Sequence, residues 1–297
     1  MVRDYINPVL EHTDMNLKKR FLTTLLLLGY GIILFAQSLT TTRFEERTFS
    51  LGGGMTHLLD TYLSPLTYKG GHVVIMDERF APTTATCGRW FSQSLFSLHG
   101  DYTLAARGRG LTVGGMADYS HTYYYEVPLL SSQKGKFRLF VGPQGLLRIG
   151  GIYNLRNSNN PAQLKLGINL AASTMAKYAF TLWHAPMNVR LQADLPLLGA
   201  AFGPDYGQSY YEIFYLKQSD GCLHMTSLHN NFSLRTKINY DIQLRSCTLR
   251  LTLTSDLYQW TLGNQYYRMF TNTIMVGFVR NLYRVTNRDG IKQHIPY

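Results

Sequence analysis

A strict alternation of apolar and polar residues, sustained over long segments, constrains the fold of this chain more than any other feature. Between Phe232 and Arg245 the apolar side chains share one parity, interrupted only at Thr236, and polar side chains occupy the other. Three more segments alternate in the same way: 164–173, 187–195 and 249–257. Because successive side chains of a strand point to opposite sides, each segment predicts a strand with one apolar and one polar face.

The length of these segments separates the possible β architectures. Strands of soluble proteins average about 5–6 residues, whereas a strand tilted through a bilayer needs about 9–11. Aromatic residues also gather toward the segment ends, as girdles at the two membrane interfaces would require: Tyr119, Tyr123, Tyr125, Tyr258, Trp260, Tyr266 and Tyr267. We therefore predict an all-β fold, an antiparallel transmembrane β-barrel, with a secreted β-sandwich as the alternative.

The start of the chain reads as an export signal. Lys18, Lys19 and Arg20 precede an apolar run over 21–35, and Ala36-Gln37-Ser38 follows. A basic region, an apolar core and small residues at the end describe a signal peptide, and the run is short for a transmembrane anchor. Residues 1–38 are thus predicted to be a cleaved leader, which directs the chain to the outer membrane of a Gram-negative bacterium.

Turn-forming residues divide the rest of the chain into strands. Short connections fall near 81–82, 131–135, 184–186 and 245–246, and longer ones near 68–71, 107–110, 154–161, 203–231 and 263–264. Short turns face the periplasm and long loops face outward in such barrels, which predicts ten strands with both termini periplasmic. The number becomes twelve if residues 210–216 and 223–228 form an extra hairpin.

This division assigns four regions to the chain. After the leader, residues 39–54 show no clear period and are assigned to an N-terminal segment. The barrel is predicted to span 55–283, and 284–297 to form a polar tail. The chain carries 29 Lys and Arg against 18 Asp and Glu, a net charge of +11.

Three phrases in the sequence are specific in combination. They are Tyr62-Leu63-Ser64-Pro65-Leu66 with Tyr68-Lys69-Gly70, then Arg156-Asn157-Ser158-Asn159-Asn160-Pro161-Ala162, then Tyr206-Gly207-Gln208-Ser209-Tyr210-Tyr211-Glu212-Ile213-Phe214. Together they resemble an uncharacterised family of Gram-negative outer-membrane β-barrel proteins with a domain of unknown function. The likeness runs from about Met55 to Tyr283. It implies a secreted precursor and an outer-membrane barrel, and it brings no activity with it.

All three phrases fall at the predicted extracellular end. They supply a set of candidate rim residues: Tyr62, Arg156, Asn157, Asn159, Asn160, Tyr206, Gln208, Tyr210, Tyr211 and Glu212. Asn, Ser and Gly turns satisfy irregular backbone there. The rim can therefore be a set of loops that plug and brace the barrel mouth, or a surface that contacts a ligand.

Charged residues occupy the parity that faces the lumen. The candidates are Arg138, Arg148, Lys165, Arg190, Asp194, Arg235, Lys237, Asp241, Arg250 and Asp256. The interior of a small barrel is filled by side chains, and buried charges must be paired, so one interpretation is an inner salt-bridge network. The apparent excess of bases favours the other, a narrow passage that prefers anions.

One constellation has the composition of a catalytic site. His99 and Asp101 share the lumen parity near the outer end of their strand, and Asp118 is expected beside them with Ser97. A histidine oriented by a carboxylate can activate water or a hydroxyl group. No metal-binding spacing and no cofactor-binding motif is present, so no metal and no cofactor are expected.

The sequence therefore predicts an outer-membrane barrel of structural, binding or narrow anion-pore type, with no chemistry evident. The alternative is an outer-membrane hydrolase with a rim site around His99. The expected partners are outer-membrane lipid, lipopolysaccharide and the barrel-assembly machinery. The leader separates the chain from nucleic acid, and the residues identify no small-molecule or glycan ligand.

Overall fold

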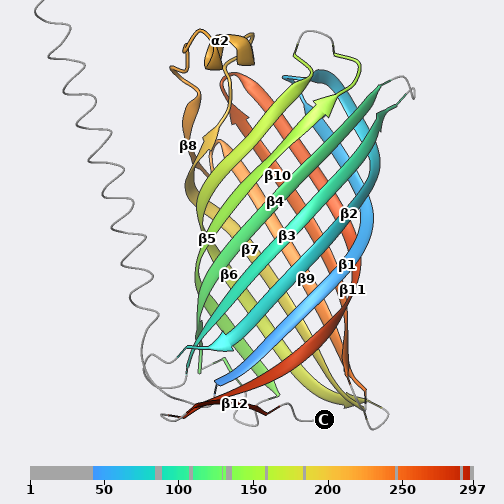
Figure 1. Ribbon diagram of the computed structural model, residues 1–297, viewed down its shortest axis with the longest axis vertical. Helices are drawn as coiled ribbons and strands as arrows, with labels where there is room; N and C mark the ends of the chain where they lie inside the picture. The colour runs from blue at the N-terminus through green and yellow to red at the C-terminus, as the bar shows by residue number, and fades with distance from the viewer. Residues whose placement is uncertain are drawn as a thin grey trace, which may run out of the picture.

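The strands close into a single antiparallel barrel (Figure 1). The computed structural model describes residues 43–83, 89–106, 110–128, 130–131, 136–157, 160–182, 185–244, 247–287 and 290–294. In chain order the elements are β1 (Arg43–Asp60), β2 (Ser64–Pro82), β3 (Trp90–Ala105), β4 (Leu111–Glu126), β5 (Phe137–Asn154), β6 (Ala162–Leu182), β7 (Ala185–Phe202), α2 (Tyr210–Phe214), β8 (Leu223–Ser227), β9 (Asn231–Gln243), β10 (Thr248–Leu262), β11 (Gln265–Asn287) and β12 (Gly290–His294). The predicted leader, 1–38, lies outside the described residues.

Ten strands make the wall, as predicted. The hydrogen-bonded order is β1-β2-β3-β4-β5-β6-β7-β9-β10-β11, and β1 closes the barrel by pairing with β11 from Arg43↔Arg284 to Asp60↔Tyr267. The twelve-strand alternative is wrong. Tyr210–Phe214 is the helix α2, and Leu223–Ser227 pairs with the same strand, β7, as β9 does further along.

The first strand corrects the predicted N-terminal segment. Residues 43–54 belong to β1 rather than to a separate region. Phe49 and Leu51 face outward while Glu46, Thr48 and Ser50 are buried inside, so the alternation is present in this stretch. Three consecutive glycines, 52–54, interrupt it, because glycine has no side chain to mark either face.

The first connection also lies elsewhere than predicted. It spans residues 61–63, between β1 and β2, where the amide of Leu63 bonds the carbonyl of Asp60. Residues 68–71 lie within β2. Their glycine pair reflects a close approach of strands rather than a turn, because a side chain at Gly70 would overlap the carbonyl of Tyr102.

The C-terminal region is structured beyond the predicted barrel. Residues 284–287 continue β11, and β12 pairs with its end from Tyr283↔His294 to Asn287↔Gly290. The polar tail is therefore in part a strand. Arg43 at the start of β1 offers a backbone partner to Arg284, and backbone pairing does not depend on side-chain polarity.

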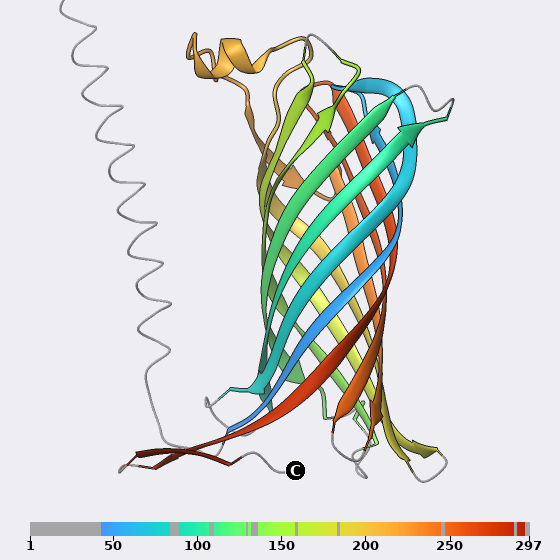
Figure 2. The ribbon, with the colours of Figure 1, turned by 45° about the vertical axis from the view of Figure 1, so that its right-hand side comes forward.

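The two ends of the barrel differ (Figures 1 and 2). The connections after β1, β5, β7 and β10 lie at one end together with α2, which we call the loop end. The start of β1 and the hairpin of β11 and β12 lie at the other, the turn end. In Figure 2 α2 projects sideways beyond the wall. No helix among the described residues is long and apolar enough to cross a membrane.

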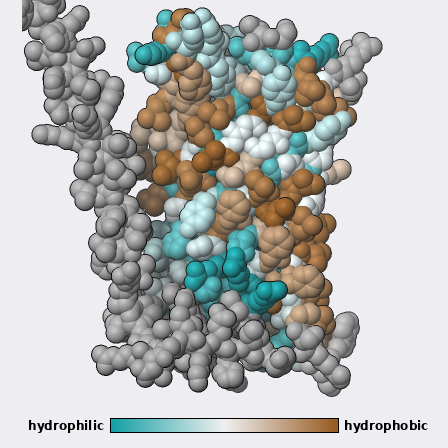
Figure 3. All heavy atoms as spheres, viewed as in Figure 1, coloured by the Kyte–Doolittle hydropathy of each residue, from teal (hydrophilic) through white to brown (hydrophobic). Residues whose placement is uncertain are grey.

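The outer wall is apolar over much of its height. On β10, Leu251 and Leu253 are 40% and 42% exposed, whereas the intervening Thr252 is buried inside. Figure 3 shows hydrophobic side chains over the upper and right-hand wall and a hydrophilic area lower down. The predicted parity is therefore confirmed on this strand, with apolar side chains outside and polar side chains inside.

Only part of the predicted aromatic girdle lies on this wall. Tyr119 and Tyr123 are outward and exposed, as expected. Tyr258, Trp260 and Tyr267 instead point into the lumen, where each is at most 9% exposed. They share the inward parity of β10 and β11, so alternation rather than aromatic character sets their direction.

Candidate functional site

The lumen contains every charged residue that the parity assigned to it. All ten candidates lie at inward positions of β5, β6, β7, β9 and β10. The sequence reasoning missed three carboxylates that face them, Glu46 and Asp60 on β1 and Glu78 on β2, all buried. These three supply the partners that the apparent excess of bases lacked.

The turn-end half of the lumen holds an ion network that crosses the barrel. Arg190 on β7 contacts Glu46 at 2.5 Å and Glu78 at 2.8 Å. Arg250 on β10 also contacts Glu46 at 2.5 Å and binds Asp241 at 2.5 Å. Arg190 on β7 lies across the barrel from Glu46 and Glu78 on β1 and β2, so the network ties opposite walls together.

Two further lysines complete the turn-end network. Lys237 on β9 contacts Glu78 at 3.0 Å, and Lys177 on β6 contacts Glu46 at 3.4 Å. Six strands thus contribute charge to one buried cluster. At the edge of this region Arg138 and Glu126 form a more exposed pair at 2.6 Å.

A second network bridges the middle of the lumen. Asp118 on β4 receives two hydrogen bonds from Arg148 on β5, both at 2.7 Å. Arg235 reaches Asp118 from β9, 117 residues away in the chain, at 2.6 Å. The same guanidinium bonds Asp256 on β10 at 3.0 Å. One carboxylate therefore joins two neighbouring strands to the far side of the barrel.

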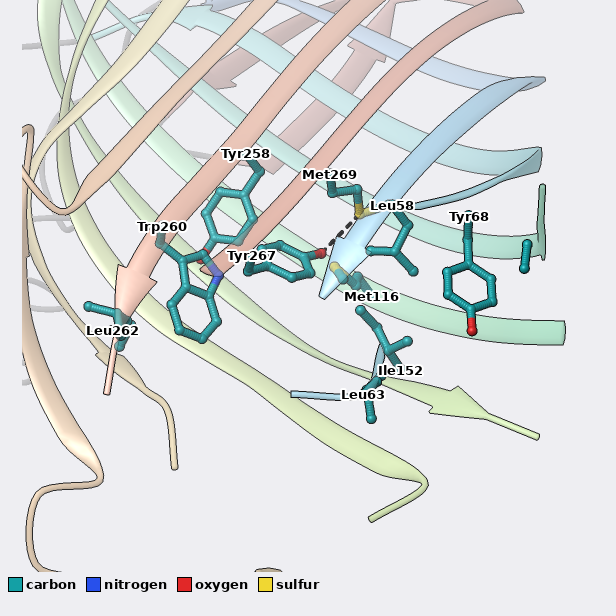
Figure 4. Close-up of a cluster of buried hydrophobic side chains, with 12 residues drawn as sticks. Leu58, Leu63, Tyr68, Met116, Ile152, Tyr258, Trp260, Leu262, Tyr267 and Met269 are labelled. Atoms are coloured by element: carbon teal, nitrogen blue, oxygen red, sulfur yellow. Dashed lines mark hydrogen bonds between the residues drawn. The ribbon is translucent and has the colours of Figure 1, made fainter. Parts of the chain in front are cut away.

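An apolar layer fills the loop-end part of the lumen. Tyr258, Trp260 and Tyr267 meet there at ring-centroid distances of 5.5–5.6 Å (Figure 4). Leu58, Leu63, Tyr68, Met116, Ile152, Leu262 and Met269 belong to the same buried cluster. Lys165 contacts Asp60 at 2.9 Å and lies 3.7 Å from the centroid of the Tyr267 ring.

These layers leave little free volume at the ion pairs. A cavity lined by Asp194, Arg235 and Tyr258 measures about 30 Å³. Another, lined by His99, Asp118 and Arg148, measures about 20 Å³. Since one water needs roughly 10–15 Å³, each holds a water or two and no larger solute.

The histidine site predicted from sequence does assemble, with an additional member. His99 Nε2 lies 2.9 Å from the Ser97 hydroxyl and 3.6 Å from Asp118. Its Nδ1 lies 3.5 Å from His72, a β2 residue that the sequence reasoning missed. His72 in turn bonds Asp101 at 2.8 Å.

The same site is not open to a substrate. Ser97 is 0% exposed, and the adjoining cavity is the one of about 20 Å³. A nucleophile must reach the reacting atom at about 3 Å, which this cavity prevents for anything larger than water. The geometry therefore favours a structural hydrogen-bond chain from Asp101 through the two histidines to Ser97, with Asp118 close by.

The three phrases that carry the family resemblance meet at the loop end. Tyr62 donates a hydrogen bond to the carbonyl of Gln208 at 3.1 Å and packs edge-on against Tyr210 at 5.9 Å. Asn157 donates to the carbonyl of Leu63 at 3.0 Å. One residue from each phrase therefore contacts another phrase, and the loops brace one another.

Within the loops, the predicted rim residues split into two groups. The first fixes backbone: Glu212 and Ser209 form a capping box at the start of α2, the Asn157 side chain accepts from the amide of Asn160, and Asn154 does the same for Arg156. The second group is exposed, with Tyr206 at 76% and Tyr211 at 60%. Asn159 lies outside the described residues.

Tyr210 anchors α2 to the barrel wall. Its hydroxyl accepts a hydrogen bond from the amide of Leu164 on β6 at 2.6 Å. Burial raises the pKa of Tyr210 to about 12, so the hydroxyl stays protonated at physiological pH. Glu212 is ionised there, since hydrogen bonds from Ser209 lower the pKa of its carboxyl.

Comparison with known protein families assigns the chain to one of them. A family model described as "Protein of unknown function (DUF3316)" matches residues 20–289. The chain belongs to this family. The match extends the resemblance seen in the sequence at both ends, and a search of curated proteins found no match.

Solved structures similar to this family member are outer-membrane barrels. The translocator domain of the autotransporter NalP from Neisseria meningitidis is 9% identical, covering 89% of this chain and 97% of that chain at a TM-score of 0.38. The outer-membrane protease OmpT from Escherichia coli is 6% identical, covering 83% and 99% at 0.42. An outer-membrane channel from Pseudomonas putida F1 is 10% identical, covering 82% and 97% at 0.32. Identities of 6–10% and TM-scores of 0.32–0.42 say nothing about activity.

Sequence reasoning missed Glu46 and Glu78 in the lumen of this DUF3316 protein because the residues around them mark the inward face only weakly. Glu78 shares the inward face of β2 with Val74 and Met76, which are apolar and pack with Leu95 and Met275. Because these inward neighbours are apolar, the alternation of polar and apolar residues does not identify the inward face of β2, and Glu78 was missed. Glu46 lies in the stretch that the glycines obscured. Among the described residues, no group of three His, Cys, Asp or Glu side chains is placed to hold a metal ion.

Proposed function

We propose that the protein is an outer-membrane β-barrel whose lumen is closed, and that it acts as a structural or binding protein through its loop end. The observation that carries this proposal is the bridge from Asp118 to Arg235 across the mid-lumen. With the turn-end network and the apolar loop-end layer, it places three successive layers of buried side chains in the path of a solute.

The pairing of the charges argues against the anion-pore alternative. A ring of free bases favours anions in a channel, but the inward lysines and arginines of the described barrel have carboxylate partners: Arg138–Glu126, Arg148–Asp118, Lys165–Asp60, Lys177–Glu46, Arg190–Glu78, Arg235–Asp256, Lys237–Glu78 and Arg250–Asp241. A lumen whose charges are paired and whose space is filled by side chains supports a closed barrel.

Single-channel recording tests the closed lumen. The mature chain, refolded and inserted in a planar bilayer, is expected to give no stable current steps, because ion pairs cross its lumen and the two cavities beside them measure only about 20–30 Å³. Insertion is checked by the heat-dependent gel shift of the same sample. Defined steps whose reversal potential in a salt gradient indicates chloride selectivity would support the anion pore instead.

The proposed location rests on the apolar wall, the leader-like start of the sequence and the family. We expect the mature chain to begin within a few residues of Ser38 and to fractionate with the outer membrane. N-terminal sequencing of the fractionated protein checks both points. Recovery of uncleaved chain beginning at Val2, or of a soluble periplasmic pool, would contradict the proposal.

A further inference from the structure

An apolar groove lies on the outside of the barrel near the loop end. Its floor is formed by Gly115 on β4 and Gly151 on β5, which are paired neighbours in the wall. Val113 and Tyr153 line its sides, and Phe214 of α2 borders it. The groove has a volume of about 530 Å³, within the range of about 300–1,000 Å³ that is typical of ligand sites.

The floor of the groove and the helix α2 that borders it are both held in place by specific residues. The two glycines are at outward positions, so the wall is lowered by two missing side chains. The helix is held by Tyr210, whose hydroxyl accepts from the Leu164 amide and whose ring stacks on Phe214 at 5.9 Å. Figure 2 shows α2 projecting beyond the wall on this side.

We propose that this groove binds one acyl chain of a bilayer lipid from the leaflet at the loop end. The groove is continuous with the apolar outer wall, because Val113 and Tyr153 are themselves exposed wall residues, so the molecules that cover the wall reach it directly. The proposal rests on the membrane location proposed above.

The chemistry of the groove fits a hydrocarbon chain better than a peptide. None of the described residues that line it carries a charged side chain. The strands beneath it are paired on both sides, β4 with β3 and β5 and β5 with β4 and β6, so no open strand edge is available for an added strand. A flexible apolar chain needs neither a charge nor a hydrogen-bond partner.

A matched pair of glycine variants tests the site. Gly151→Phe places a ring in the groove, and its Cβ would lie at an ordinary 3.5 Å from the Gln163 carbonyl. Gly145→Phe is the control, because Gly145 faces outward on the same strand with no atom within 4 Å and is not part of the groove. Each chain is refolded into vesicles containing a phospholipid with a diazirine on its acyl chain.

Photolabelling followed by peptide mapping gives the readout. In the wild-type chain and in Gly145→Phe, label is expected to concentrate on the groove peptides of β4, β5 and α2 relative to the wall peptide of β10. In Gly151→Phe this enrichment should fall about tenfold, the loss expected when roughly two methylene groups no longer fit. Phe214→Ala, which alters α2 and leaves the wall intact, should lower it as well.

The possible outcomes separate this proposal from the proposed function. Even labelling around the wall of an inserted wild-type chain, shown by its heat-dependent gel shift, overturns the groove while the membrane location stands. Equal loss in Gly145→Phe and Gly151→Phe also overturns it. A wild-type chain that does not insert overturns the membrane location and the groove together.

Discussion

Replacing Arg250 by alanine is expected to lower the free energy of unfolding by about 3–5 kcal/mol, the cost of removing one partner from a buried ion pair. Arg250 is 1% exposed and contacts Glu46, Glu78 and Asp241. Within the described part of the chain, its loss leaves Asp241 with one long hydrogen bond, from Asn188 at 3.4 Å. Denaturant titration of the barrel in vesicles measures the change, and the heat-dependent gel shift should move to lower temperature.

Arg79→Ala is the matched control for this experiment. Arg79 also pairs with a carboxylate on the neighbouring strand, Glu45 at 2.7 Å, but its side chain is 47% exposed on the outer face. Exposed pairs contribute about 0–1 kcal/mol, so this variant should unfold nearly like the wild type. Equal, small effects of the two substitutions would show that water screens the lumen, and the closed barrel would have to be abandoned.

Leu253→Arg is expected to destabilise the inserted barrel by about 2–4 kcal/mol, the cost of a base on the lipid face near the midplane. Leu253 is 42% exposed on the outer face of β10, where its side chain would lie against lipid. The free energy of unfolding from vesicles checks the value, and the insertion yield should fall with it.

The control for depth is Thr261→Arg on the same strand and the same face. Thr261 is exposed at the loop end of β10, where the cost of a charge should fall to about 0–1 kcal/mol. If both substitutions were tolerated equally, the outer wall would be facing water. A secreted barrel would then replace the outer-membrane assignment.

The sequence alone was enough to predict the architecture, because a barrel wall repeats one simple rule. A strand of period two between lipid and a polar interior shows that period in its residues, so the parity of Arg250 and Leu251 followed without coordinates, and the number of strands was narrowed to ten or twelve. The rule failed where the polarity of a residue did not indicate whether its side chain faces the lumen or the outside. Glycines 52–54 obscured β1, and apolar inward residues such as Val74 and Met76 obscured Glu78.

The candidate site was predictable as a set of residues but not as a set of pairs. Parity placed Arg235, Asp241 and Asp256 in the lumen without pairing them, and the structure shows Arg235 paired with Asp256 and with Asp118 from the far wall. Likewise, His99 and Asp118 were expected side by side, since adjacent strands fix their register. His72 was not expected, because the register of β2 depended on a turn placed at the wrong residues.

What the sequence by itself determined is therefore the direction, in or out, of the side chains in the clearly alternating segments, since direction depends only on parity along one strand. Which charges meet across the lumen depends on barrel closure and strand stagger, which relate residues more than a hundred positions apart. Tyr258, Trp260 and Tyr267 are the exception, because the prediction followed their aromatic character and not their parity. Their clustering was visible in the sequence, but only the closed barrel showed that they fill the loop end of the lumen and do not form a girdle outside it.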